Sequence, residues 1–213
     1  PGISSAASDV YKRQLIKSAT IIDKKSDFHD LTQDILIEDG LIVKVANSIK
    51  NTNNYKVIQF ENLHVSQGWF DSSVCFGEPG YEDRETIKNG LDVAAKSGFT
   101  SVALQPNTFP VMDGHTAIAF AKAQANSTAT ALYPVGSLTA KSKGLQLAEI
   151  YDMSEAGSVA FGDYKIPIKN PNILKIGLQY ASNFGGLLLS FPQEISIAQS
   201  GVMNESKSST RMG

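Results

Sequence analysis

The sequence predicts an α/β protein in which a small antiparallel β-sheet precedes parallel strands that alternate with helices. Three observations predict it. Residues 15–60 contain short β-like runs, and Asp39–Gly40 between two of these runs is a two-residue hairpin signal. After Leu63, five strand-like runs alternate with helix-like runs, which is typical of parallel βα units. The 42% hydrophobic and 19% charged content is that of an ordinary globular protein.

The first fourteen residues are left out of this fold prediction. Residues 1–14 show no apolar period and no signal-peptide pattern, and residues 9–14 resemble the translated end of a transposon used in DNA library preparation. We expect residues 1–14 to be a non-native tail, and an ordinary tail is the alternative.

The next region predicts a small sheet. The expected strands are residues 15–22, 34–37, 41–45 and 55–60. A region of about 50 residues is small for independent stability.

The following region predicts βα units. The expected strands are residues 64–74, 101–104, 131–135, 159–162 and 186–189, and the expected helices are residues 85–96, 115–126, 145–156 and 171–184. Pro171 at the start and Gly185 past the end support the last helix. Periodicity alone leaves open a doubly wound sheet and part of an eightfold barrel.

Charge and motifs exclude several functions. Lys and Arg total 19 against 21 Asp and Glu, so no basic surface for nucleic acid or an anionic membrane is expected. No apolar run approaches the roughly 20 residues that span a bilayer. The single cysteine, Cys75, cannot form an internal disulfide, which indicates a reducing compartment and predicts a cytoplasmic protein. The sequence contains no GxGxxG, Walker A or GxSxG motif.

In both architectures functional groups gather beyond the carboxyl ends of the strands, and there the sequence resembles a known family. Residues 68–83, GWFDSSVCFGEPGYED, resemble the signature of dihydroorotases in the amidohydrolase superfamily. Further similar segments follow in the family's order: residues 105–113, QPNTFPVMD; residues 133–139, YPVGSLT; residues 156–163, AGSVAFGD; and residues 201–205, GVMNE. The resemblance covers residues 15–213.

This resemblance implies a small β domain followed by a TIM (β/α)8 barrel with a metal site at its mouth. Roughly 150 residues follow Leu63, against about 250 in a complete barrel. We therefore expect an incomplete barrel of about five βα units. The expected domains are residues 15–62, part of the small β domain, and residues 63–213, the first part of the barrel.

The resemblance also implies that the metal site is degenerate. Where the family has two zinc-binding histidines on the first barrel strand, this sequence has Ser73 and Cys75, and Ser190 replaces a histidine at the end of the fifth strand. The family's arginine that pairs with the substrate carboxylate is Gly77 here. A serine hydroxyl is a poor zinc ligand.

Two family positions are retained. Asp163 matches an aspartate near the metals, and Asn107 matches an asparagine that contacts the substrate carboxylate. Each also has a structural interpretation: Asp163 as a cap or loop hydrogen-bond acceptor, and Asn107 as a turn residue. We expect Cys75 to be a small buried side chain. Lys165 is a candidate for a carbamylated bridging lysine like that of the related hydantoinases, but it lies two residues past Asp163. The histidines His29, His64 and His115 fall outside the motif positions.

Two functional hypotheses remain. The first is a non-catalytic dihydroorotase homologue without a cofactor, a structural partner of aspartate carbamoyltransferase that also forms homo-oligomers. The second is an active cyclic amidohydrolase whose zinc is held by an altered set including Cys75 and Asp163. A doubly wound binding domain outside the family is a weaker third hypothesis.

Overall fold

The structure, a computed structural model, describes residues 13–199 and 201–212. The chain divides into two compact units, one ending at Gln67 and the other beginning at Gly68, whereas we expected the boundary after residue 62. Most of the predicted non-native tail, residues 1–12, lies outside the described residues. Arg13 and Gln14 belong to the first strand, so the sheet begins two residues earlier than expected.

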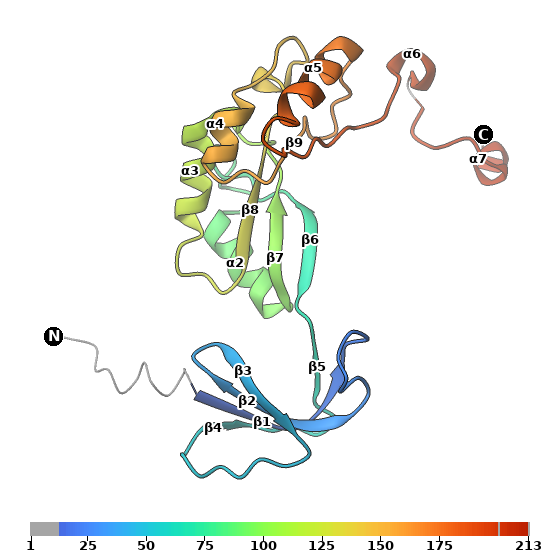
Figure 1. The fold of residues 1–213 in the computed structure, drawn as a ribbon. Coiled ribbons are helices and arrows are strands. Elements are labelled where there is room, and N and C mark those ends of the chain that lie inside the picture. Colours follow the sequence, from blue (N-terminus) through green and yellow to red (C-terminus); the bar gives the residue numbers. More distant parts are fainter. Residues whose placement is uncertain (1–12, 200, 213) are drawn as a thin grey trace. The chain divides into compact units, whose positions relative to one another are not determined.

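The first unit is a five-stranded sheet of mixed direction. Its order is β3-β2-β1-β4, and β5 also pairs with β1 (Figure 1). The pairs β1–β2 and β2–β3 are antiparallel as predicted, but β4 and β5 run parallel to β1. The antiparallel expectation is corrected for these two strands, because the chain crosses back after β3 before it pairs with β1. The strands are β1 Arg13–Ile22, β2 Thr32–Glu38, β3 Leu41–Ala46, β4 Lys56–Ile58 and β5 His64–Ser66.

The predicted two-residue hairpin turn is confirmed. Glu38 pairs with Leu41 across the turn, and Asp39 and Gly40 have φ angles of 50° and 79°. Positive φ at both central residues is the geometry that matches the twist of a hairpin, and it favours the Asp-Gly sequence.

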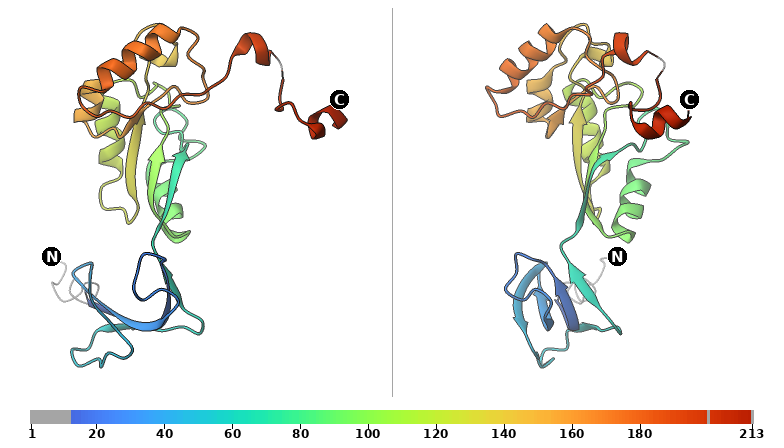
Figure 2. Two further views of the ribbon diagram at one scale, coloured as in Figure 1. Left: turned by 45° about the vertical axis from the view of Figure 1, so that its right-hand side comes forward. Right: turned by 90° about the vertical axis from the view of Figure 1, so that its right-hand side faces the viewer.

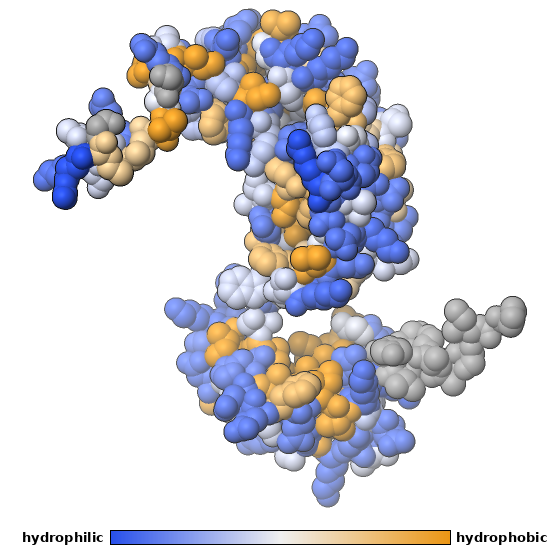
Figure 3. Space-filling view, turned by 180° about the vertical axis from the view of Figure 1, so that it is seen from behind, coloured by the Kyte–Doolittle hydropathy of each residue, from blue (hydrophilic) through white to orange (hydrophobic). Residues whose placement is uncertain are grey.

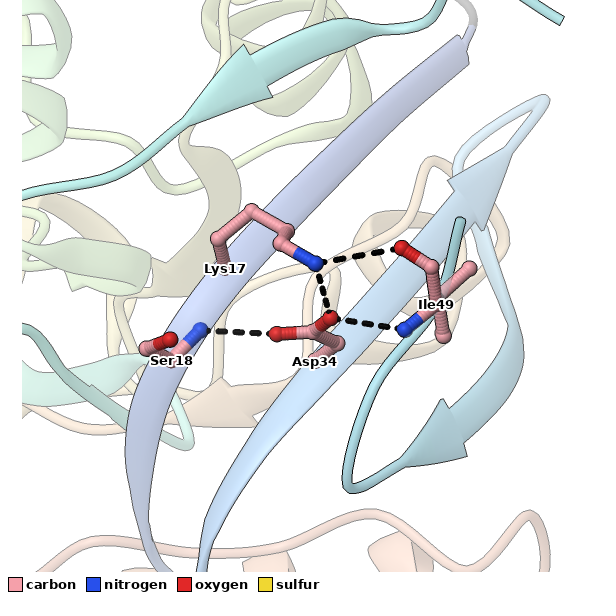
Figure 4. Close-up of polar contacts among 4 residues, drawn as sticks. All are labelled: Lys17, Ser18, Asp34 and Ile49. Carbon is pink, nitrogen blue, oxygen red and sulfur yellow. Dashed lines mark hydrogen bonds and ion pairs between the residues drawn. The ribbon is translucent and has the colours of Figure 1, made fainter. Parts of the chain in front are cut away.

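A partly buried ion pair joins β1 and β2 of this unit (Figure 4). Lys17 Nζ donates to Asp34 Oδ2 and to the Ile49 carbonyl, 3.1 Å away. The Asp34 carboxylate also accepts from the backbone N–H groups of Ser18 at 2.9 Å and Ile49 at 2.8 Å. Burial by itself raises the pKa of Asp34, but these hydrogen bonds outweigh burial and hold the pKa below its ordinary value.

The predicted strand over residues 64–74 is two strands that belong to different units. β5 pairs with β1, whereas β6, Trp69–Val74, begins the second sheet. Gly68 between them passes so close to the next strand that a Cβ atom would lie 2.1 Å from the Thr100 side chain. The sequence predicted one strand because both halves are β-like and only Gln67 and Gly68 separate them.

The second unit is a curled parallel sheet, part of a barrel, in the order β6-β7-β8-β9. Helices pack along one side of this sheet (Figures 1 and 2). The further strands are β7 Phe99–Leu104, β8 Ala131–Gly136 and β9 Ala160–Phe161. The helices are α2 Ile87–Lys96, α3 His115–Gln124, α4 Ile150–Glu155 and α5 Pro171–Ala181, with a 3₁₀ turn η1 at Ala140–Ser142 and short helices α6 Ile195–Ala198 and α7 Lys207–Met212.

The main core lies between this sheet and its helices. Val102 and Leu104 of β7 pack with Leu91 of α2 and Ile118 of α3, and all four side chains are buried. Alternate residues of the parallel strands face the opposite side, where Ala103, Val135 and Ala160 form a smaller cluster. The helical side thus carries most of the apolar burial of this unit.

Two predicted elements of this unit are shorter than expected. The helix predicted over residues 145–156 is α4 alone, because Leu147 instead forms a bridge with Thr139. The strand predicted over residues 186–189 is a single bridge from Leu188 to Phe161, since β9 offers only two residues for pairing.

Several large apolar side chains remain exposed on the second unit. Phe70 of the edge strand β6 and Tyr133 of β8 are 60% and 39% exposed. Apolar residues are visible among polar ones on the surface shown in Figure 3.

Across residues 13–199 and 201–212, no helix has the length and apolar character required to cross a membrane.

Candidate functional site

A cavity of about 290 Å³ lies where three parallel strands of the second unit end. Ser73 lies near the end of β6, and Gln105 comes directly after β7. Asp163 and Lys165 lie just past the end of β9. The segment after the Leu188 bridge adds Ser190. The carboxyl ends of parallel strands are where barrel proteins place functional groups, so this cavity is the candidate site.

The cavity brings together three of the predicted site positions and leaves out three. Ser73, Asp163 and Ser190 all line it. The lining residues do not include Cys75, Gly77 or Asn107.

Asp163 is a buried hydrogen-bond acceptor in this structure. Its side chain accepts from the Ser137 hydroxyl at 2.8 Å and from the Thr139 backbone N–H at 3.0 Å, both at Oδ1. Oδ2 accepts from the Thr139 hydroxyl, which in turn accepts from the Gly144 N–H at 2.8 Å. Asp163 is only 4% exposed. The carboxylate therefore ties the end of β9 to the loop after β8, in agreement with its structural interpretation.

The residues present do not fit a zinc site. Zinc in proteins takes about four ligands, mostly thiolate, imidazole and carboxylate. Ser73 and Ser190 contribute neutral hydroxyls to the cavity, and both Asp163 oxygens already accept hydrogen bonds. Among the described residues, no three His, Cys, Asp or Glu side chains are grouped so that they would hold a metal ion.

Cys75 does not occupy the position that we expected. The structure places its thiol at the surface, not in the core, which corrects the expectation of a buried side chain. Residue 75 comes directly after β6, which ends at Val74, and Ser73 two residues earlier is exposed as well. Cys75 is also absent from the lining of the cavity, so it does not join Asp163 there.

Gly77 has a conformation that opposes the family's arginine. Its φ angle is 104°, and a Cβ atom there would lie 2.8 Å from the Tyr81 carbonyl oxygen. The Tyr81 N–H donates back to the Gly77 carbonyl at 3.0 Å. A side chain at this position therefore requires the backbone of the turn to move.

Asp71, in the first of the family-like segments, and the remaining residues singled out above have local roles. Asp71 accepts from the Ser73 N–H at 2.9 Å. Asn107 is half-buried in the turn after β7, where the Pro106 carbonyl accepts from the Thr108 N–H at 2.8 Å. His115 opens α3 at the surface. His29 contacts Asp30, and His64 Nδ1 contacts the Asn62 carbonyl.

Gln105 and Tyr164 line the cavity but were not singled out in the sequence analysis, and Lys165 lies beside Tyr164. Gln105 is only 6% exposed, and its amide donates weakly to the Ser72 carbonyl at 3.4 Å. The Tyr164 ring lies 5.0 Å from the Lys165 ammonium. Their signal was position alone: Gln105 directly follows β7, and Tyr164 lies three residues past the end of β9.

A second cavity, of about 750 Å³, lies far along the chain, among residues 192–205. It includes the segment Gly201–Glu205 that resembles a family motif, and its charged lining is Glu194 and Glu205. The Ser196 hydroxyl and N–H hold the pKa of Glu194 below its ordinary value. No nucleophile or cation lines this cavity within the described residues, so it is a weaker candidate.

Comparison with known proteins agrees with the sequence motifs. Residues 64–213 match the family model described as dihydro-orotase-like. The dihydroorotase of Pelotomaculum thermopropionicum is 40% identical over 199 residues, which is 93% of this chain and 46% of that protein. The dihydroorotase of Syntrophus aciditrophicus is 34% identical over 201 residues, with 93% and 47% covered. The chain thus spans slightly less than half the length of these relatives.

Solved structures show the same fold. An L-hydantoinase (dihydropyrimidinase) from Arthrobacter aurescens superposes with a TM-score of 0.72 and 19% identity, over 88% of this chain and 42% of that one. A dihydroorotase crystal structure has a TM-score of 0.57 and 12% identity, over 83% of this chain and 50% of that one. At this identity the likeness concerns the fold alone, which is that of part of a (β/α)8 barrel.

Proposed function

Since this chain belongs to the dihydroorotase-like family, we propose that it is a non-catalytic member of pyrimidine biosynthesis in the cytoplasm that has lost zinc-dependent hydrolysis. The active alternative requires a working metal site. The side chains that the strand ends offer to a metal, Ser73, Asp163 and Ser190, argue against such a site.

The state of Asp163 carries this proposal. It is the one carboxylate among the residues that line the cavity, and three donors from Ser137 and Thr139 occupy it. The neighbouring positions, Ser73 and Ser190, supply hydroxyls in place of imidazoles. Without a metal to lower its pKa, a water molecule is a weak nucleophile at neutral pH.

The energetic consequence is large. Metal activation of water and polarisation of a carbonyl each contribute several kcal/mol to the transition state. Each 1.36 kcal/mol corresponds to a tenfold rate. Loss of both effects therefore lowers turnover by many orders of magnitude.

Restoring imidazoles tests the proposal without relying on turnover. We compare zinc affinity, by competition with a chromogenic chelator, for the wild-type chain, for Ser73→His/Ser190→His and for a control, Ser182→His/Ser196→His, with both changes at the surface. The first pair adds two imidazoles beside Asp163, so zinc binding is expected to rise at least a hundredfold over the wild type and the control. Tight binding by the wild type would disprove the proposal.

A structural role requires a surface for a partner. The exposed apolar side chains Phe70 and Tyr133 on the parallel sheet are suited to an interface. We propose that this surface binds a second copy of the chain and aspartate carbamoyltransferase, and that neither interaction requires zinc. Co-elution of the purified chain with that enzyme in size-exclusion chromatography is expected, and separate elution at tens of micromolar would contradict the assignment.

A further inference from the structure

A third cavity, of about 480 Å³, lies on the second unit beside the neighbouring helices α3 and α4 (Figure 1). Its lining comes from the loops after β6 and β7, from the first turns of α3 and from the residue before α4. Within the described residues, none lines both this cavity and the one at the strand ends, so the two are separate. Its volume is in the range of pockets that bind small organic molecules.

The walls of the third cavity are largely apolar and are held in place by the backbone. The apolar lining includes Pro79, Pro110, Val111 and Phe120. The Phe109 N–H donates to the Pro79 carbonyl at 2.9 Å, which ties the loop after β6 to the loop after β7. Because these segments are already joined, a ligand needs to order little of the chain when it binds.

Two carboxylates, Asp113 and Glu149, lie at this cavity. Glu149 Oε2 is 3.4 Å from the position that a Cβ atom on Gly114 would take, so this carboxylate lies over the start of α3. Asp113 Oδ2 accepts from the Lys141 N–H at 2.8 Å. The ion pairs of the described residues include neither carboxylate. Both therefore keep negative charge that can pair with a ligand.

Little positive charge opposes these two carboxylates. Among the described residues, no lysine or arginine lines the cavity, and His115 at the start of α3 belongs to neither ion pair. The N-terminus of α3 contributes about half a positive charge, which is less than the two carboxylates carry. Negative charge beside apolar walls is complementary to a cation with an apolar body.

We propose that the third cavity binds a small organic ammonium, whose nitrogen pairs with Glu149 and Asp113 and whose apolar part contacts Phe120. The cation is organic, because no three His, Cys, Asp or Glu side chains of the described residues are grouped to hold a metal ion. The site is independent of the proposed loss of zinc binding, because it shares no residue with the cavity that Asp163 lines. Zinc measurements therefore do not decide this proposal.

Phenethylammonium is the probe, with neutral phenethyl alcohol and anionic hydrocinnamate as control ligands. Binding to the purified chain is followed by ligand-detected NMR titration. The alcohol has the same ring but no charge, so it is expected to bind about fivefold more weakly than the ammonium. Hydrocinnamate is expected to bind more weakly still, because the carboxylates repel it.

The charge is tested with Glu149→Gln and the matched control Glu155→Gln. Both glutamates are exposed, and Glu155 at the other end of α4 does not line the cavity. Glu149→Gln is expected to weaken phenethylammonium binding about fivefold, and Glu155→Gln less than about twofold. A thermal melt verifies that both variants remain folded.

The apolar wall is tested with Phe120→Ala against Phe109→Ala. Phe109 is also exposed but does not line the cavity. Phe120→Ala is expected to weaken binding about fivefold, and Phe109→Ala less than about twofold.

Absence of phenethylammonium binding, or equal binding of the alcohol, would overturn the ammonium site. Equal effects of the two glutamate changes, or of the two phenylalanine changes, would also overturn it. Tighter binding of a phenylalanyl-lysine peptide than of phenethylammonium would assign the cavity to a partner protein and overturn the small-molecule proposal.

Discussion

At the scale of single residues, one carboxylate is predicted to be structural. Replacing Asp163 with Ala leaves the Thr139 N–H buried without its acceptor, along with two hydroxyls that must find other partners. We expect Asp163→Ala to lower the free energy of unfolding by about 3 kcal/mol. The measurement is urea denaturation followed by circular dichroism.

The control for this change is Asp92→Ala on the exposed surface of α2. It is expected to change the free energy of unfolding by less than about 0.5 kcal/mol. Equal effects of the two substitutions would show that Asp163 is not a buried structural acceptor.

A second carboxylate makes stability depend on pH. Because hydrogen bonds lower the pKa of Asp34 in the folded state, its contribution is complete above the unfolded pKa near 4. It is lost as the pH falls further, through the lower folded pKa. When the pH is lowered from 5 to 3, the melting temperature of the wild type is therefore expected to fall more than that of Asp34→Asn.

Asp27→Asn, a change at an exposed position of the same unit, provides the comparison. It is expected to follow the wild-type pH profile. If Asp34→Asn also follows that profile, the hydrogen bonds to Asp34 do not stabilise the folded form.

At the scale of elements, Gly77 tests the geometry of the turn after β6. Gly144→Ala is expected to lower the free energy of unfolding by about 1 kcal/mol, because alanine is strained at a positive φ. Gly77→Ala is expected to lower it at least twice as much. Both glycines have positive φ, but a Cβ atom meets the Tyr81 carbonyl at Gly77 and open space at Gly144. Thermal unfolding measures both, and equal losses would mean that the turn relaxes freely.

The elements show where sequence patterns suffice. Helix α5 begins at the predicted Pro171, because proline in the first turn is a local start signal, and α3 begins at the predicted His115. The divided run at residues 64–74 was missed because it depends on the approach of Gly68 to Thr100 of β7. The shortened α4 was missed because it depends on the bridge between Leu147 and Thr139 in the preceding loop. The candidate site was predicted in part. The resemblance to the family motifs located Ser73, Asp163 and Ser190, whereas Gln105 and Tyr164 were not singled out, because a position past a strand end does not by itself tell which side chains face a cavity.

At the scale of the whole molecule, the parallel sheet is expected to drive self-association. Its edge strand β6 exposes Phe70, and exposed apolar edges promote pairing with other chains. Multi-angle light scattering is expected to show mass rising with concentration for the wild type and a smaller rise for Phe70→Lys.

Phe109→Lys is the matched comparison, since Phe109 is similarly exposed but lies in a loop outside the sheet. It is expected to behave like the wild type. A monomer at all concentrations would rule out the sheet as an association surface.

The central claim is that a family member with this donor set does not hold zinc. The most direct measurement is the zinc content of the purified chain by mass spectrometry, after dialysis without chelator and alongside the dihydroorotase of Pelotomaculum thermopropionicum. We predict less than about 0.1 zinc ion per chain, because Ser73 and Ser190 offer only hydroxyls and Asp163 is already hydrogen-bonded. A content near one or two ions per chain, lost on Asp163→Asn, would contradict the claim.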